Sequence, residues 1–303
     1  TMKVDDINFK FFHINKWDNG EFKGDAISTT SELVKISSDG NLGLEEGQKF
    51  ERGGIYRFTV DVTKGNTKAV LTVEKVGKVD LPAPDIFFGN DKMEVTDTDI
   101  YKSDQAFTQG QMITVTGIDN LNEWWIDPDF FEKQSDGALK FLPINGDYRV
   151  TANAVLKYFS VMALKDGKPA KLQDDGTGAI WAIGKGIGKP SVTSSEVGWE
   201  PSKALCLAQV APKKYQLTLK AGETLKTSGD PEVISFKFFH QNDWGGEFGN
   251  YANSILVEQL KLADSGNLEM QDNKAFEEGA VYRFTIDVTN GNANADLKVE
   301  KIN

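Results

Sequence analysis

The sequence contains very little cysteine and histidine for a chain of 303 residues. Cys206 is the single cysteine, and His13 and His240 are the two histidines. A disulfide framework is therefore excluded, and a zinc site has few ligands to draw on. Cys206 lies in an alternating apolar run, which favours a buried strand position over a catalytic thiol. We expect neither a cofactor nor a bound metal.

Long apolar runs and basic stretches are also absent. No segment approaches the roughly 18 apolar residues that a membrane-spanning helix needs, and no charged-then-apolar leader opens the sequence. This fits a cytoplasmic protein or an exported one whose leader has been removed. The net charge of −11 is spread without a basic stripe, which argues against nucleic acid and anionic membrane surfaces as partners.

Strong helical periodicity is scarce, and strand patterns take its place. Short segments rich in β-branched and aromatic residues alternate with period two between Asp-Gly and Asn-Gly turns. The clearest are residues 55–62, 112–116, 147–152, 215–219 and 281–288. The best helical candidates are residues 26–35 and 252–262. The pattern predicts an all-β fold of tandem β-sandwich domains, of immunoglobulin-like or carbohydrate-binding-module-like type.

An internal repeat dominates the sequence. The first copy contains FKFFHINKWDNGEF and IYRFTVDVTKGN, and the second contains FKFFHQNDWGGEF and VYRFTIDVTNGN. From Glu21 onward the copies keep a constant separation of 226 residues, as between Glu21 and Glu247 or Lys75 and Lys301. Duplicated small modules more often bind than catalyse, because two weak contacts with a repetitive ligand reinforce each other.

Two breaks suggest three domains. Pro82 and Pro84 mark one linker, and the Gly/Asp-rich residues 173–178 mark another. We predict a partial repeat of the binding module at 1–78, a β-rich accessory domain at 79–176, and a complete module at 177–303. The strands expected at residues 179–183, 204–209 and 215–219 have no counterpart before the first copy. Either the sequence begins inside a module, or the missing strands come from the middle unit or from another chain.

Each copy carries a lysine in its aromatic strand, a tryptophan just after it and a Gly-Asn-Leu segment. The residues that form this pattern are Lys237, Trp244 and Asn267 in the second copy, preceded by Trp199, and Lys10, Trp17 and Asn41 in the first.

The alternation of side chains along a β-strand predicts the face on which Lys237 lies. Phe236 and Phe238 share one face of their strand, so Lys237 and Phe239 share the other. A lysine facing a sandwich core is implausible, so we expect Lys237 to face outward. The first copy has no counterpart of Trp199, so the complete site is expected in the second copy.

This order of residues resembles the starch-binding modules of the SusE and SusF surface lipoproteins of gut Bacteroidetes, and more distantly the glycogen-binding module of AMP-activated kinase. The resemblance implies a β-sandwich in which Trp199 and Trp244 stack on sugar rings while Lys237 and Asn267 bond the hydroxyls, and in the first copy Lys10, Trp17 and Asn41 match these glycan-binding residues. The chemistry agrees, because sugars present apolar faces and rings of hydroxyls that suit rigid aromatic surface beside directional polar groups. The alternative is that the tryptophans fill the space between two sheets and that the lysines are ordinary solvated residues. The resemblance also implies a lipid-anchored position on the outer membrane, at the cell surface. The implied partners are a polysaccharide or oligosaccharide, a TonB-dependent transporter and a SusD-like protein.

The middle region resembles accessory domains of proteins of the same glycan-uptake type. Its Trp124-Trp125 pair, followed by Asp127, Asp129 and Glu132, also allows a glycosidase interpretation with paired carboxylates. Carboxylates within six residues rarely span a substrate from opposite sides, so we expect no enzyme. Calcium binding at Asp127/Asp129 or at Asp97/Asp99 is a further alternative, although no full ligand loop is present.

The sequence thus predicts a non-catalytic surface polysaccharide-binding protein that supports glycan capture and uptake. Two other functions stay open: an adhesin-like or scaffolding protein whose modules bind protein partners, and an ancillary part of a polysaccharide-degrading enzyme. The glycan itself is not determined by these motifs.

Overall fold

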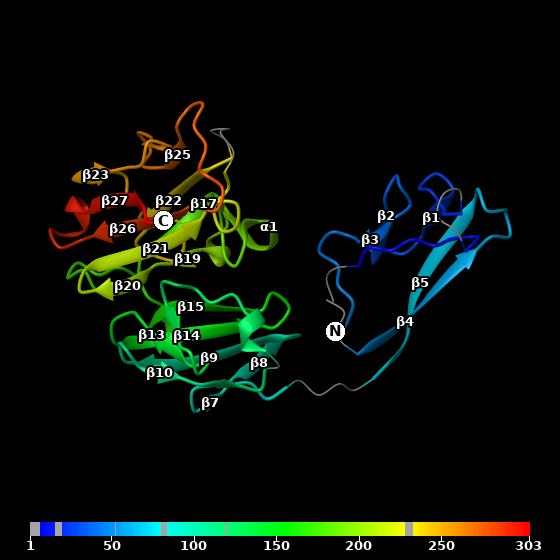
Figure 1. Ribbon diagram of the computed structural model, residues 1–303, viewed down its shortest axis with the longest axis horizontal. Helices are drawn as coiled ribbons and strands as arrows, with labels where there is room; N and C mark the ends of the chain where they lie inside the picture. Colours follow the sequence, from blue (N-terminus) through cyan, green and yellow to red (C-terminus); the bar gives the residue numbers. More distant parts are fainter. Residues whose placement is uncertain (1–6, 16–19, 52, 80–83, 119, 228–232) are drawn as a thin grey trace. The chain divides into compact units, whose positions relative to one another are not determined.

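The computed structural model describes residues 7–15, 20–51, 53–79, 84–118, 120–227 and 233–303. Strands account for 46% of the chain and helices for 5%, in several separate sheets, so the predicted all-β sandwich class is confirmed. The contacts divide the chain into two compact units, Thr1–Ala83 and Pro84–Asn303 (Figure 1). The predicted division into three domains stays a prediction.

The N-terminal unit packs short strands around a small apolar core. β1 runs parallel to β5, and β5 is antiparallel to β4. β2 and β3 form a hairpin, which a bridge between Phe9 and Leu42 extends. The core contains Phe22, Ile27, Val34, Leu42, Ala69 and Leu71. The strands are β1 (Ile27–Thr29), β2 (Val34–Ile36), β3 (Leu42–Leu44), β4 (Gly54–Asp61) and β5 (Ala69–Lys78).

The second unit begins with the middle region. Its main sheet has the order β16-β15-β14-β9-β8, with two smaller sheets, β10-β13-β12 and β11-β6-β7. The predicted strand at residues 112–116 divides between these two, because β10 pairs with β13 and β11 with β6. The elements are β6 (Phe87–Phe88), β7 (Asp91–Lys92), β8 (Glu94–Asp97), β9 (Ile100–Phe107), β10 (Met112–Ile113), β11 (Val115–Thr116), η1 (Leu121–Glu123), β12 (Phe131–Lys133), β13 (Leu139–Phe141), β14 (Gly146–Asn153), β15 (Tyr158–Lys165) and β16 (Lys168–Pro169).

The C-terminal module is a sandwich of two sheets. One has the order β18-β17-β22-β25-β24 with β19 beside β17, and the other has the order β20-β21-β26-β27-β23. The rings of Phe236 and Phe238 on β22 meet Phe284 on β26 at centroid distances of 5.5 and 6.4 Å, so the core lies between the sheets. The elements are β17 (Trp181–Gly188), α1 (Val192–Ser195), β18 (Glu196–Gly198), η2 (Pro201–Lys203), β19 (Leu205–Cys206), β20 (Ala208–Ala211), β21 (Lys214–Lys220), β22 (Ser235–Phe239), β23 (Asn253–Ile255), β24 (Leu260–Leu262), β25 (Leu268–Met270), β26 (Val281–Asp287), η3 (Asn292–Asn294) and β27 (Asp296–Lys301).

Both helical candidates were wrong. Residues 26–35 contain β1 and β2, and residues 252–262 contain β23 and β24. In the first segment the Thr29 hydroxyl accepts from the Ser31 N–H, and the Ser31 hydroxyl accepts from the Leu33 N–H, which competes with helical bonding. In the second segment, β23 pairs with β27 and β24 with β25, so pairing with distant strands overrides the local pattern.

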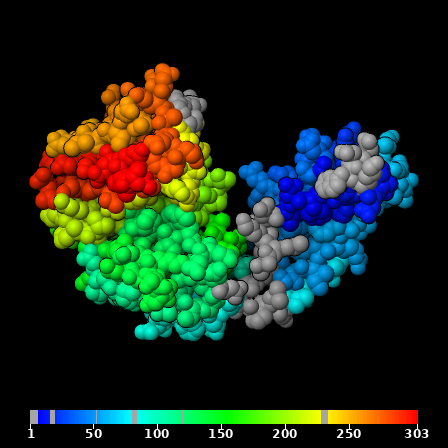
Figure 2. Space-filling model, in the orientation of Figure 1, coloured from blue at the N-terminus to red at the C-terminus, as the bar shows by residue number. Residues whose placement is uncertain are grey.

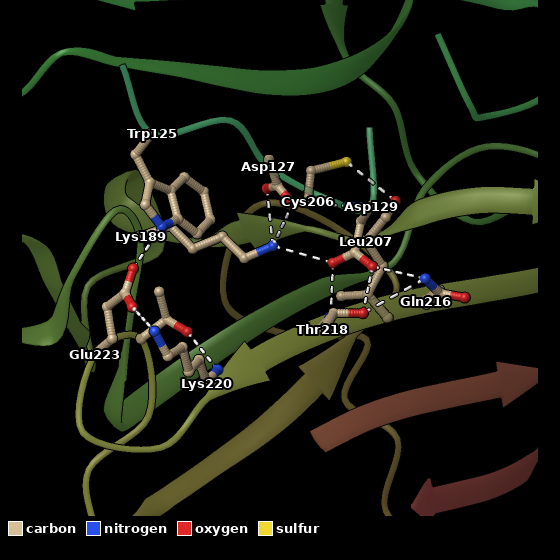
Figure 3. Close-up of polar contacts among 11 residues, drawn as sticks. Trp125, Asp127, Asp129, Lys189, Cys206, Leu207, Gln216, Thr218, Lys220 and Glu223 are labelled. Atoms are coloured by element: carbon tan, nitrogen blue, oxygen red, sulfur yellow. Dashed lines mark hydrogen bonds and ion pairs between the residues drawn. The ribbon is translucent and has the colours of Figure 1, made fainter. Parts of the chain in front are cut away.

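A buried ionic cluster joins the middle region to the C-terminal module (Figure 3). Lys189, just after β17, donates to both carboxylate oxygens of Asp127 at 2.9 and 2.8 Å and to Asp129 at 3.1 Å. All three residues are almost completely buried. Asp129 also accepts from the Gln216 amide at 2.7 Å and from the Thr218 hydroxyl and N–H, both at 2.6 Å. The cluster therefore ties the Asp-Pro-Asp turn of the middle region to β17 and β21.

The pKa values of Asp127 and Asp129 shift in opposite directions. Burial raises the pKa of Asp127 above its ordinary value, although Lys189 opposes this. Burial also disfavours the charged form of Asp129, but Lys189 and the bonds from Thr218 and Gln216 outweigh burial and lower its pKa. The bonds from Thr218 and Gln216 therefore favour the charged form of Asp129 over that of Asp127.

Further contacts surround the cluster. The Trp125 indole donates to Glu223 at 2.6 Å and lies 5.9 Å from the Lys189 ammonium. Apolar residues of both parts belong to one continuous core, and the two parts form one body in the space-filling view (Figure 2). The middle region and the C-terminal module are thus packed as a single unit.

Replacing Lys189 by methionine should destabilise this unit strongly. Lys189→Met leaves two neighbouring carboxylates buried without their cation, which costs about 3–5 kcal/mol of unfolding free energy. Urea unfolding followed by tryptophan fluorescence measures the change. Lys203→Met is the control, since Lys203 forms an exposed pair with Glu200, and its cost should stay below about 1 kcal/mol. Equal costs for the two variants would contradict the assigned role of the cluster.

Candidate functional site

The order of strands in the sheet brings together Trp199 and Trp244, the two tryptophans predicted to bind a glycan. β18 and β22 both pair antiparallel with β17, on its opposite sides, so they run in the same direction. Trp199 directly follows β18, and Trp244 lies in the loop that follows β22. Parallel strands end at the same edge of a sheet, and both tryptophans lie there.

The two indole rings are offset and nearly parallel. Their centroids lie 6.2 Å apart, and their planes are inclined by 25°. Trp244 is 50% exposed and packs edge-on against Phe239 at 6.0 Å. Trp199 is half-buried and contacts the apolar core. Trp244 is therefore not a plug between two sheets, and the pair presents aromatic surface at the rim of the sandwich.

The loop around Trp244 is held by groups that sequence reasoning did not single out. The Asp243 carboxylate accepts from the Trp244 N–H at 2.7 Å, and the Gln241 amide donates to the Trp244 carbonyl at 2.6 Å. Gly245 and Gly246 have φ angles of +83° and +70°, which other residues adopt only with strain. The Asp-Trp-Gly-Gly turn pattern was the signal that could have identified these residues.

Lys237 and Asn267 lie opposite each other on the outer face of the same sheet. Phe236 and Phe238 are fully buried and Lys237 between them is half-buried, which agrees with a place for Lys237 on the other face of β22. Phe239, on the same face as Lys237, is fully buried. Phe236 pairs with Leu268, and this register places Lys237 across from Asn267. The Asn267 amide donates to the Ser235 hydroxyl at 3.3 Å, which leaves its carbonyl as an acceptor. In the part of the chain that the structure describes, Lys237 forms no ion pair.

The four residues are linked through Phe239. Lys237 and Phe239 are two positions apart on one face of β22, about 7 Å along the strand. Phe239 is itself fully buried and contacts Trp244, and Trp244 contacts Trp199. The aromatic pair and the polar pair are therefore neighbours. Such a surface can stack on an apolar ring face while it donates to and accepts from hydroxyl groups.

The N-terminal unit repeats the polar pair. The bridge between Phe9 and Leu42 places Lys10 across from Asn41, as in the second copy, and both are half-buried. Trp17 lies outside the described residues. The Asn41 N–H donates to the Ser37 hydroxyl at 3.1 Å.

The residues considered as catalytic or metal-binding candidates lie in other environments. Burial raises the pKa of the Cys206 thiol to about 12, so its reactive thiolate is disfavoured. Asp127 and Asp129 are bonded to Lys189 rather than directed at a cleft. Asp97 accepts from the Thr98 N–H at 2.7 Å. Among the described residues no group of three or more histidines, cysteines and carboxylates could hold a metal ion. Every helix in that part of the chain is too short or too polar to span a lipid bilayer.

Comparison with protein-family models assigns the chain to a family. The model described as a domain of unknown function (DUF5121) matches residues 1–63 and 175–289, more than half of the sequence. The chain therefore belongs to this family. Both matches end at equivalent positions of the repeat, Thr63 and Thr289. A second model, also a domain of unknown function (DUF5125), matches residues 79–172. No curated protein matches the chain.

The loss of unfolding free energy on substitution should distinguish the exposed Trp244 from a tryptophan of the core. Trp244→Ala removes a half-exposed ring with few supporting contacts, so we expect a loss of about 1 kcal/mol or less in unfolding free energy. Trp181→Ala is the comparison, because Trp181 is fully buried and its indole donates to the Ala170 carbonyl at 3.0 Å. Its loss should be about 3–5 kcal/mol. Equal losses in urea unfolding would assign Trp244 to the core.

Proposed function

We propose that this chain is a non-catalytic polysaccharide-binding protein whose ligand binds at Trp199, Trp244, Lys237 and Asn267. The observation that carries the proposal is the offset tryptophan pair, with Trp244 50% exposed beside an outward lysine–asparagine pair. A large aromatic surface that stays half exposed costs hydrophobic stabilisation, so a ligand that covers it accounts for its place.

The chemistry of the surface supports a sugar over other small ligands. Indole faces suit the apolar faces of pyranose rings, while an ammonium and an amide carbonyl bond hydroxyl groups in defined directions. Trp244 is half exposed in the loop that follows β22. An exposed aromatic surface can bind a chain of many sugar units without enclosing an end.

The cellular role that we propose follows the resemblance to SusE and SusF lipoproteins. In that role the protein is the lipid-anchored part of a glycan-capture system at the outer membrane. It delivers polysaccharide to a TonB-dependent transporter that works with a SusD-like protein. The order of the site residues supports this role.

A binding screen with soluble polysaccharides tests the function. Affinity electrophoresis identifies a ligand, and calorimetry then measures its dissociation constant. Trp244→Ala should weaken binding about 30-fold, because a central tryptophan contributes about 2 kcal/mol or more. Trp199→Ala should act in the same direction. Lys237→Met should weaken binding about tenfold, because bonds to a charged donor are worth about 1.5–3 kcal/mol.

Matched controls decide where the ligand binds. Trp125→Phe changes a tryptophan of the middle region and should leave affinity unchanged. Lys10→Met changes the N-terminal counterpart of Lys237 and should have little effect if the second copy holds the ligand. Full binding by Trp244→Ala would refute this site, and failure to bind any glycan would favour the protein-partner alternative.

A further inference from the structure

The buried ionic cluster contains the groups that can form an amide bond between two side chains. Lys189 supplies an amine, Asp127 supplies a carboxyl group, and Asp129 supplies a second carboxyl group that can move protons (Figure 3). All three side chains are at most 3% exposed. Asp127 and Lys189 are 62 residues apart in the sequence, so a bond between them would join the middle region to the C-terminal module.

The amine of Lys189 lies close to the carboxyl carbon of Asp127. The Lys189 Nζ is 2.9 and 2.8 Å from the two carboxylate oxygens of Asp127. The carbon between these oxygens therefore lies about 3–3.5 Å from Nζ, which is the separation of a near-attack arrangement. The last side-chain torsion of an aspartate has broad energy wells, so its rotation can turn the face of the carboxyl group toward the amine.

The two aspartates have different hydrogen-bond partners, which gives them different roles. Asp129 accepts from the Gln216 amide and from the Thr218 hydroxyl and N–H. Burial disfavours its charge, but Lys189 and these bonds lower its pKa. Asp127 accepts from Lys189 and from the Asp129 N–H at 3.0 Å, and burial raises its pKa. Asp127 is therefore the carboxyl group that takes up a proton more readily, and Asp129 stays available as a base.

A proton must leave Lys189 before it can react, because an ammonium is not a nucleophile. Burial disfavours the Lys189 ammonium, but the charges of Asp127 and Asp129 outweigh burial and raise the pKa of Lys189. The ammonium is therefore the resting form, and it passes a proton to Asp127 along the hydrogen bond of 2.8 Å. The resulting amine and neutral acid carry no charge, which lowers the cost of their burial.

We propose that Lys189 and Asp127 form an intramolecular isopeptide bond, with Asp129 as the base. The Lys189 Nζ attacks Cγ of the protonated Asp127, and Asp129 takes a proton from the nitrogen. Asp129 then gives this proton to the hydroxyl group on Cγ, which leaves as water. One N–C bond forms and one C–O bond breaks, and Asp129 carries the same charge at the start and at the end. No further reactant is consumed.

The surroundings of the cluster favour the amide over the separate groups. The amide is neutral, so its formation removes an ion pair whose burial is costly. The fold already holds the reacting groups together, which removes the entropy cost of a bimolecular reaction. The Trp125 ring lies 5.9 Å from the Lys189 Nζ and packs edge-on against the buried Tyr158. These rings limit the access of water that would hydrolyse the bond.

The intact mass of the full chain tests the bond. Protein purified in the folded state and then denatured should be lighter in mass spectrometry, by one water molecule, than its sequence predicts. Digestion should yield a branched peptide in which the segment of Lys189 is joined to that of Asp127. Asp127→Asn should reach the same product by loss of ammonia, so its final mass should equal that of the unsubstituted chain.

Two further variants locate the reaction. Lys189→Met removes the amine, so this variant should keep its full mass whether it folds or not. A cyclic imide formed at an Asp-Gly step would instead lose water in this variant as well. Asp129→Asn keeps the shape of the side chain and removes the base, so the bond should form at least about 100-fold more slowly during refolding. Circular dichroism checks that Asp129→Asn is folded.

Two results would overturn the proposal. One is a folded, unsubstituted chain that keeps its full mass. The other is a loss of water that persists in Lys189→Met. An unchanged rate in folded Asp129→Asn would contradict the role of Asp129 as the base. None of these results bears on glycan binding by the C-terminal module.

Discussion

Backbone pairing along β17 and β21 is the constraint on which the rest of this structure depends. β17 gives β22 a partner on its second edge, buries Phe236 and Phe238 against the facing sheet, and brings the end of β18 beside the end of β22. The approach of Trp199 to Trp244 follows from that strand order. β21 does the same for β26 in the other sheet. The N-terminal copy keeps the register of Lys10 and Asn41, which the hairpin of β2 and β3 sets.

The same two strands also anchor the middle region. Lys189 follows β17, and Gln216 and Thr218 lie on β21, so the buried cluster around Asp129 exists only where both strands are present. An ion cluster of this kind is costly to bury, and its bonds must all be satisfied for it to hold the two parts of this unit together. The division into compact units falls between the N-terminal copy and the middle region. The two strands that build the sandwich thus also hold the middle region against it.

The sequence allowed prediction of the strands whose alternation is set by a buried face, such as those that became β21 and β26. Alternation also placed Lys237 on the outer face. Residues 26–35 and 252–262 were mistaken for helices because their short strands are fixed by partners elsewhere in the chain, which local periodicity does not record. Trp199 and Trp244 were predicted as a pair only from the resemblance to known modules. The pairing of β18 and β22 with β17, which brings the two rings together, depends on tertiary structure and cannot be seen in the local sequence. The ionic cluster went unrecognised because Lys189 is 62 residues from Asp127, and no local pattern marks a buried lysine.

The two copies of the repeat keep one polar pair in different surroundings. Lys10 and Asn41 lie on the segment that extends β2 and β3. Lys237 and Asn267 lie in the sheet that also contains β17 and β18, and the order of these strands brings Trp199 to Trp244. The aromatic contact therefore depends on β17 and β18, whereas the polar pair depends only on the pairing of β22 with β25.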